Sequence, residues 1–309
     1  MQLVTFAIDE PDGRLGLLDG GRVLDLAAVA AARGGDAGLV ATMERFLAGG
    51  ARALDLAGRL HDDATRLGEP AWWLDLAAVR LLPPVPRPPK ILCLAGNYAA
   101  HIREGGGVAP AKTNTTPQVF IKPITTLIAH GEPIRLPGPL CTAVDYEGEL
   151  VAVIGRAGHN VAAAHALDYV AGYACFNDVS GRRLNIEVER EINARTGFFD
   201  WLNGKWFDTF GPLGPAMVTA DAVPDPQALT LTTRVNGAVR QQAGTGDMIF
   251  GVAETVAWIS RFLTLQPGDL IATGTPSGVG ATTGAFLQAG DVVEVEITGL
   301  GTLRNPVAA

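Results

Sequence analysis

The sequence predicts a mostly β, α+β fold, in which a rolled or sandwiched mixed sheet makes up the larger part of the chain. Strand patterns outnumber helical patterns after Lys90, without regular alternation of strand and helix. Residues 83–89 are rich in proline, which excludes helix and favours an extended chain. We therefore expect a small N-terminal β/α domain over residues 1–82, a linker over 83–89, and a second domain over 90–309.

Composition excludes several classes of protein. The net charge of −8 and the lack of a basic run argue against binding to nucleic acid. No stretch of about 18 uncharged apolar residues predicts a membrane span, and the N-terminus lacks a signal-peptide pattern. The three cysteines, an odd number in or beside apolar runs, fit buried thiols in a reducing compartment. We expect a cytoplasmic protein.

The N-terminal region carries no candidate chemistry. Residues 1 to about 30 alternate short apolar runs with turns, among them Pro11-Asp12-Gly13, which predicts a small antiparallel β unit. From Ala27 to about Leu67 the apolar residues recur at helical spacing.

The stretch from Asp145 to Gly155 predicts one β-strand that carries two acids. Glu147 and Glu149 stand at i and i+2, so their side chains point to one face, about 7 Å apart at the backbone. A second apolar run, residues 169–180, ends near Asp178. Clustered carboxylates repel unless a proton or a cation separates them, and Mg²⁺ or Ca²⁺ prefers oxygen ligands. The alternative is a pair of exposed glutamates on an edge strand.

A histidine and an acid follow the strand predicted at residues 91–95. One or two helical turns over Tyr98 to Glu104 place His101 and Glu104 at i and i+3, on one face. A carboxylate beside an imidazole orients it as a general base, although a surface pair is the alternative. Residues 105–107 are three glycines, which suit the hinge of a lid.

Later segments are predicted from turn residues and periodicity. Residues 211–215 predict a turn before a strand at 216–219, and Asn236-Gly237 predicts a hairpin. Residues 252–263 have helical spacing, and residues 292–298 predict a strand that closes the sheet. Residues 273–280 form a Gly-rich turn, but its spacing is wrong for a dinucleotide site and no Gly-Lys-Ser/Thr is present.

Six segments, in this order, resemble the fumarylacetoacetate hydrolase family over roughly Lys90 to Val307. They are Gly96–His101 with Glu104, Phe120–Pro123, Asp145–Leu150, Asn177–Arg182, Gly204–Phe210 and Thr273–Gly280. None is decisive alone, but six in sequence are highly specific. The resemblance implies the same rolled or sandwiched fold and a homodimer.

The resemblance also implies roles for individual residues. A Mg²⁺ ion, with Mn²⁺ or Ca²⁺ as alternatives, would be held by Glu147, Glu149 and Asp178. His101 and Glu104 would activate water, and Lys122 would face the site as a cation that holds an oxyanion. Substrate contacts would come from Arg182, Asn185, Lys205 and Thr275. Without the resemblance, Lys122 would be interpreted as a solvated lysine at the end of a strand. Lys205 would be interpreted as a lysine whose stem packs on aromatic residues while its ammonium stays in water.

Two departures from the family pattern follow Arg182. Many members continue with Asp, an apolar residue and Gln, whereas this chain has Arg183, Leu184 and the shorter amide Asn185. The segment 186–203 is longer than in the smallest members and ends in the aromatic cluster 198–201. That cluster suits the core, a pocket wall or a dimer contact.

We expect hydrolytic cleavage of a carbon–carbon bond in an acylpyruvate-like or fumarylacetoacetate-like compound. Decarboxylation of a 2-oxo acid such as oxaloacetate, or isomerisation of a 2-hydroxy-dienedioate, would use the same site without attack by water. A catalytically silent binding protein is a further alternative, which the three clustered acids disfavour.

Overall fold

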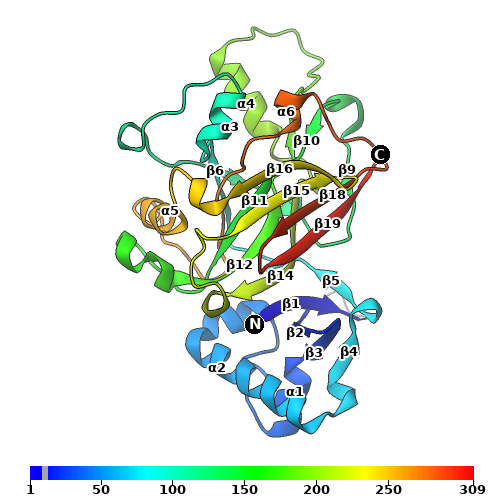
Figure 1. Cartoon of the computed structure of the whole chain (residues 1–309). Coiled ribbons are helices and arrows are strands. Elements are labelled where there is room, and N and C mark those ends of the chain that lie inside the picture. The colour runs from blue at the N-terminus through cyan, green and yellow to red at the C-terminus, as the bar shows by residue number, and fades with distance from the viewer. Residues whose placement is uncertain (9–12) are drawn as a thin grey trace.

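The computed structural model describes residues 1–8 and 13–309, so most of the turn predicted at residues 11–13 lies outside the described residues. The small unit at the N-terminus packs below a larger β-sandwich (Figure 1). This unit contains β1 (Gln2–Ala7), β2 (Arg14–Asp19), β3 (Arg22–Asp25), α1 (Leu26–Arg33), α2 (Met43–Leu67), β4 (Trp73–Asp75) and β5 (Arg80–Leu82). The antiparallel pairing of β1, β2 and β3 agrees with the sequence pattern.

The larger sheet runs without interruption from the N-terminal unit into the sandwich. Its strand order is β4-β3-β2-β1-β14-β12-β11-β17-β6-β7, and β1 meets β14 where Leu3 lies opposite Met217. The strands beyond β1 are β6 (Ile91–Ala95), β7 (Gln118–Lys122), β8 (Leu127–Ile128), β11 (Gly148–Ile154), β12 (Val170–Asn177), β14 (Gly211–Thr219) and β17 (Leu270–Ala272).

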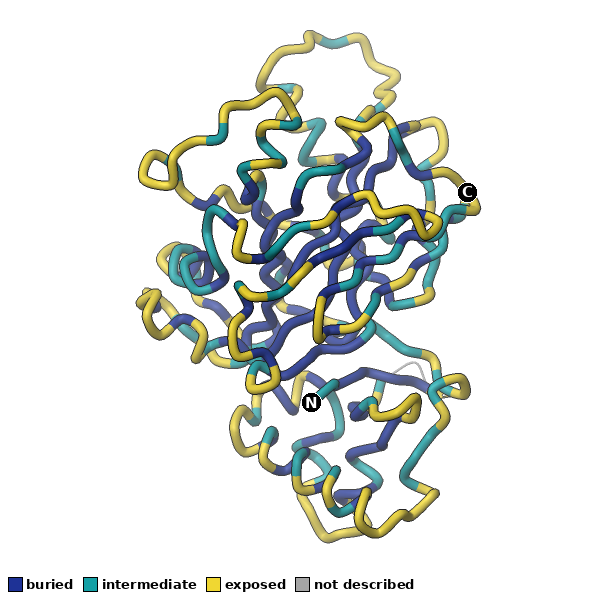
Figure 2. The backbone as a smooth tube through the Cα atoms, in the orientation of Figure 1, coloured by how far each residue is buried: buried dark blue, intermediate teal, exposed yellow. Residues whose placement is uncertain are grey.

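A second sheet covers one face of the first. It consists of β9 (Ile134–Arg135), β15 (Thr230–Val235), β16 (Ala238–Gly244), β18 (Val292–Ile297) and β19 (Gly301–Ala308). Along β11 the side chains alternate between two cores, as the period of two in a strand requires. Leu150 and Ala152 pack toward the second sheet, whereas Val151 and Val153 pack toward the core shared with the N-terminal unit. Figure 2 shows these central strands as the most deeply buried part of the chain.

The structure corrects two sequence predictions and adds one strand. The strand predicted over 145–155 is two strands, β10 (Val144–Asp145) and β11, because the amide of Glu147 donates to the side chain of Asn177 and not to a backbone carbonyl of the neighbouring strand β12. The turn predicted at residues 211–215 belongs to β14, which changes register there. The final strand β19 was not predicted. The hairpin at Asn236-Gly237 joins β15 to β16, as expected.

The helices that matter for the site gather at the end of the sandwich far from the N-terminal unit (Figure 1). They are α3 (Ala99–Glu104), α4 (Ala194–Asn203) and α6 (Gly280–Thr283), near the short pair of β10 and β13 (Ser180–Gly181). Helix α5 (Val252–Ile259) covers the side of the sandwich. Among the described residues, no helix is both long and apolar enough to cross a lipid bilayer. All three cysteines are buried and free.

The close contact of β12 with β14 generates a stability prediction. A Cβ added at Gly172 would lie 2.4 Å from the carbonyl oxygen of Val218 on the neighbouring strand, so the backbone would have to move. We expect Gly172→Ala to lower the free energy of unfolding by about 1–3 kcal/mol. Gly58→Ala is the control, since a Cβ there in α2 meets nothing within 4 Å and should stabilise the helix by about 0.5–1 kcal/mol. Urea denaturation measures both, and equal effects would contradict the packing account.

Candidate active site

Two neighbouring strand ends bring the three predicted acids together. Gly148 lies opposite Asn177 in the pairing of β11 with β12, and the amide of Asp178 donates to the carbonyl of Glu147 at 2.8 Å. One carboxylate oxygen from each of Glu147, Glu149 and Asp178 lies within 4.8 Å of the others. All three residues are buried, so the alternative of exposed edge-strand glutamates is wrong.

Two buried lysines contact this cluster of acids. The ammonium of Lys205 donates to Glu147 at 2.7 Å and to Asp178 at 2.6 Å, while that of Lys122 donates to Asp178 at 2.6 Å. Burial lowers the pKa of Lys122 despite the adjacent carboxylate. Burial also acts on Lys205, but Asp178 and Glu147 outweigh it and hold the pKa of that lysine above its ordinary value. The solvated and snorkelling readings of these lysines are therefore wrong.

The carboxylates differ in how far nearby positive groups offset their buried negative charge. Burial opposes the charge of Glu147, but Lys205 and Arg182 lower the pKa of that carboxyl below its usual range. Glu149 accepts the amide of Gly274 at 2.8 Å, yet burial and the charges of Asp178 and Glu147 raise its pKa well above its ordinary value. A divalent cation bound here would offset the cost of burying the negative charge of Glu149. The all-oxygen donor set fits a hard ion such as Mg²⁺ or Mn²⁺.

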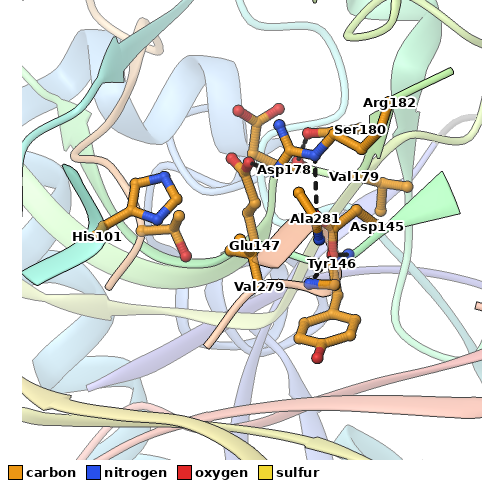
Figure 3. A network of polar contacts seen from close by, with 12 residues as sticks. His101, Asp145, Tyr146, Glu147, Asp178, Val179, Ser180, Arg182, Val279 and Ala281 are labelled. Atoms are coloured by element: carbon orange, nitrogen blue, oxygen red, sulfur yellow. Dashed lines mark hydrogen bonds and ion pairs between the residues drawn. The ribbon is translucent and has the colours of Figure 1, made fainter. Parts of the chain in front are cut away.

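A fourth acid, Asp145, holds the arginine and the Gly-rich turn in place (Figure 3). Its carboxylate accepts the Nε of Arg182 at 2.9 Å and the amides of Gly280 at 2.6 Å and Ala281 at 2.9 Å. Arg182 also pairs with Glu147 through Nη2. Burial of Asp145 raises its pKa, and Arg182 opposes this shift. In this structure the guanidinium of Arg182 is thus oriented by two carboxylates.

The predicted histidine–glutamate pair is formed at the end of α3. Nδ1 of His101 lies 2.7 Å from Oε1 of Glu104, and the other carboxylate oxygen of Glu104 accepts the amide of Gly278 and the hydroxyl of Thr282, at 2.8 and 2.9 Å. The acid is therefore held by Gly278, just before α6, and by Thr282, within α6. With Nδ1 bonded to Glu104, Nε2 is the nitrogen of His101 that remains for a reactant.

A cavity of about 140 Å³ joins these groups. It is lined by Leu94, Ala95, Gly96, His101, Phe120, Glu147, Arg182, Trp201, Lys205 and Thr275. His101 and Glu147 thus border the same space, although they are far apart in the sequence. The volume is enough for a small organic molecule.

The remaining predicted residues have different positions. The hydroxyl of Thr275 donates to the carbonyl of Gly148 and accepts from Gln241, so its proton is already engaged. Asn185 is exposed and is not among the residues that line the cavity. The aromatic cluster is divided, since Trp201 packs edge-on to Phe120 at 4.9 Å and lines the cavity, whereas residues 198 and 199 are about half exposed.

Sequence reasoning assigned no role to two residues that organise the site. Asp145 shares the two-residue spacing of Glu147 and Glu149, which was a usable signal. Gln241 donates to Thr275 and accepts the amide of Gly148 at 3.0 Å, from a strand nearly a hundred residues later. No local pattern in the sequence marks that glutamine.

Comparison with known proteins gives consistent matches. The family model for the fumarylacetoacetate (FAA) hydrolase C-terminal region matches residues 90–308. A mitochondrial oxaloacetate tautomerase from Xenopus laevis is 39% identical over 312 residues, which cover 99% of this chain and 90% of the relative. The structure of a maleylpyruvate hydrolase from Sphingobium sp. SYK-6, in complex with manganese(II) and pyruvate, is similar with a TM-score of 0.75 and 31% identity, over 100% of this chain and 99% of that one. A 2-hydroxyhepta-2,4-diene-1,7-dioate isomerase from Mycobacterium marinum has a TM-score of 0.70 and 32% identity, over 100% and 98%.

The cluster of acids predicts a measurable metal affinity that depends on Glu149. We expect Glu149→Gln to weaken Mn²⁺ binding at least about tenfold, because it removes a negative oxygen donor. Glu296→Gln is the matched control, since Glu296 lies on β18 and pairs with Arg234 away from the cluster. Calorimetric titration of the apo protein gives both constants, and unchanged affinity in Glu149→Gln would exclude this residue as a ligand.

Proposed function

The chain belongs to the fumarylacetoacetate hydrolase family, and on that premise we propose that it is a metal-dependent hydrolase of a carbon–carbon bond. Its substrate would be a β-diketo or 2-oxo acid of the acylpyruvate or fumarylacetoacetate type. The observation that carries the proposal is the contact of His101 with Glu104, 2.7 Å long, on the cavity that Glu147 also lines. This contact supplies an oriented base next to the candidate metal ligands.

The candidate metal ligands are Glu147, Glu149 and Asp178, whose oxygens converge within 4.8 Å. A divalent ion bound there would act as a Lewis acid on the adjacent oxygens of a 2-oxo acid and stabilise negative charge on them. Arg182 and Lys205 border the same cavity and offer the carboxylate of the substrate two cationic donors.

His101 would move the protons. Its Nε2 takes a proton from water, and the resulting hydroxide adds to the distal carbonyl carbon of the substrate. When the carbon–carbon bond breaks, its electron pair remains on the carbon next to the 2-oxo group, as an enolate. The protonated His101 returns the proton to that carbon, so the products are a carboxylic acid and a 2-oxo acid. Glu104 keeps the ring oriented through both transfers.

A second candidate is keto–enol tautomerisation of an oxaloacetate-type acid. It is favoured by the identity of 39% to an oxaloacetate tautomerase over nearly the whole chain. In that reaction the same Nε2 of His101 would remove a proton from carbon and return it to oxygen.

Decarboxylation of a 2-oxo acid is the remaining alternative. It would need a cation that stabilises the enolate, but it would not need a base that activates water. The homodimer and the cytoplasmic location stay predictions.

Removal of divalent ions tests the metal requirement. Activity on acetylpyruvate should be lost after treatment with EDTA and should return with Mg²⁺ or Mn²⁺, because enolate stabilisation depends on a cation held by the three acids. Pyruvate release in a coupled assay gives the rate. Activity that persists after exhaustive chelation would rule out the metal role.

Substitution of the histidine tests the proposed base. We expect His101→Ala to lower the kcat of acylpyruvate hydrolysis by about 10²–10⁴, while oxaloacetate decarboxylation is largely retained. His165→Ala is the matched control, because His165 is exposed and pairs with Asp168 outside the cavity. A product screen with acylpyruvates and 2-oxo diacids, read by NMR, separates hydrolysis from tautomerisation. Equal losses in both reactions would show that His101 is not a dedicated base for water.

A further inference from the structure

We propose that a second cavity beside the active-site cavity receives the substrate's tail and selects tails that are uncharged and mostly apolar. This tail cavity has a volume of about 240 Å³. It is lined by Leu94, Ala95, Gly96, Asn97, Ile102, Pro110, Thr115, Thr116, Pro117, Gln118, Ile249 and Phe250. The proposed function is needed here only to place the 2-oxo acid head in the neighbouring active-site cavity.

The two cavities are neighbours on one face of the larger sheet. They share Leu94, Ala95 and Gly96 at the end of β6. In the pairing of β6 with β7, Phe120 lies opposite Cys93 and Gln118 opposite Ala95, two residues further along. Residues opposite each other in a pair of strands point to the same face, as do alternate residues of one strand. Phe120 and Gln118 therefore lie next to each other on one face of β7. Phe120 lines the active-site cavity and Gln118 lines the tail cavity.

Helix α3 divides its side chains between the two cavities in the same way. His101 lines the active-site cavity, and Ile102, the next residue, lines the tail cavity. Gly96, which has no side chain and a φ of +62°, lines both cavities. A Cβ at this position would lie 3.6 Å from Ile102, in ordinary contact, so this part of the shared wall consists of backbone alone. A substrate whose reacting carbonyl faces His101 would extend its tail past Gly96.

The chemistry of the tail cavity favours neutral groups. None of its lining residues is charged; the polar side chains are amides and hydroxyls. A lysine does approach, because Lys112 lies over the ring of Phe250 at 5.7 Å, but its ammonium pairs with Glu254 at 2.6 Å. Because Lys112 is not among the lining residues, a carboxylate that enters the cavity would lose its hydration without gaining a cation on the wall, which is costly. An alkyl or aryl tail would gain from burial.

The size of the cavity agrees with a tail of several carbons. An apolar cavity of about 150 Å³ is large enough to bind benzene, and this cavity is larger. The tails that fit are thus a short alkyl chain or a single ring. The relatives named as acting on oxaloacetate, maleylpyruvate and a hydroxy-dienedioate act on diacids, so this chain would differ from them in the tail it accepts. Of the substrates proposed above, it would take acylpyruvates with a neutral acyl group and not the diacids fumarylacetoacetate and oxaloacetate.

The experiment compares binding of two unreactive acids that differ only at the far end, 2-oxohexanoate and 2-oxoadipate. Calorimetry with the Mn²⁺-loaded full chain measures both dissociation constants. We expect 2-oxohexanoate to bind at least about tenfold more tightly. Equal or tighter binding of 2-oxoadipate would overturn the proposal.

Two substitutions on the cavity wall sharpen the test. Gln118→Arg adds a cation to the cavity and should shift the preference toward 2-oxoadipate by about tenfold, whereas Val108→Arg, on an exposed position outside the cavity, should not. Lys112→Gln should leave the preference unchanged; if it weakened binding of 2-oxoadipate alone, Lys112 would be a receptor for charged tails and the proposal would be wrong.

Binding and turnover fail independently in this design. A preference for 2-oxohexanoate in a protein that cleaves no acylpyruvate would overturn the proposed hydrolysis and retain the tail cavity. Hydrolysis of acylpyruvates with no preference between the two acids would overturn the tail cavity and retain the proposed hydrolysis.

Discussion

Four carboxylates confined to one buried volume impose the main constraint on this structure. Asp145, Glu147, Glu149 and Asp178 are all at most 5% exposed, and their mutual repulsion would unfold the site if it were not compensated. The compensation comes from separate elements, with Lys122 at the end of β7, Arg182 after β13 and Lys205 after α4. Lys122 contacts Asp178, Arg182 contacts Asp145 and Glu147, and Lys205 contacts Glu147 and Asp178. The three elements therefore converge on the cluster of acids.

The close backbone approach around Lys205 shows how tightly that convergence is fixed. The amide of Gly181 donates to the carbonyl of Gly204, and a Cβ at Gly204 would lie 2.1 Å from the carbonyl oxygen of Gly181. Only glycine allows α4 to end against β13 in this way. The ammonium of Lys205 lies 5.5 Å from the ring centroid of Phe120 and 5.8 Å from that of Trp201, and it also contacts the acids.

The His101–Glu104 pair and Asp145 are held by the same short segment. Residues 278 and 282 bind Glu104, and residues 280 and 281 bind Asp145, so the start of α6 and the residues just before it position both the histidine pair and the arginine. Related proteins with hydrolase, isomerase and tautomerase activities share this fold. Under the proposed function, the cluster of acids and His101 would serve each of these reactions, because enolate chemistry needs a cation held by acids and a base, whereas the reaction and the substrate would depend on the residues beyond them.

The sequence by itself determined the fold class, the family and the three acids, because period-two alternation and short motifs are local properties. It also predicted the contact of His101 with Glu104, which needs only one helical turn. The division into domains at residues 83–89 stays a prediction, since the larger sheet continues from β14 into β1. Only the tertiary structure decided the burial of Lys122 and Lys205, the exposure of Asn185, and the roles of Asp145 and Gln241. Those features depend on contacts between residues far apart in the chain, and apart from the two-residue spacing of Asp145 from Glu147, such contacts leave no periodic pattern in the sequence.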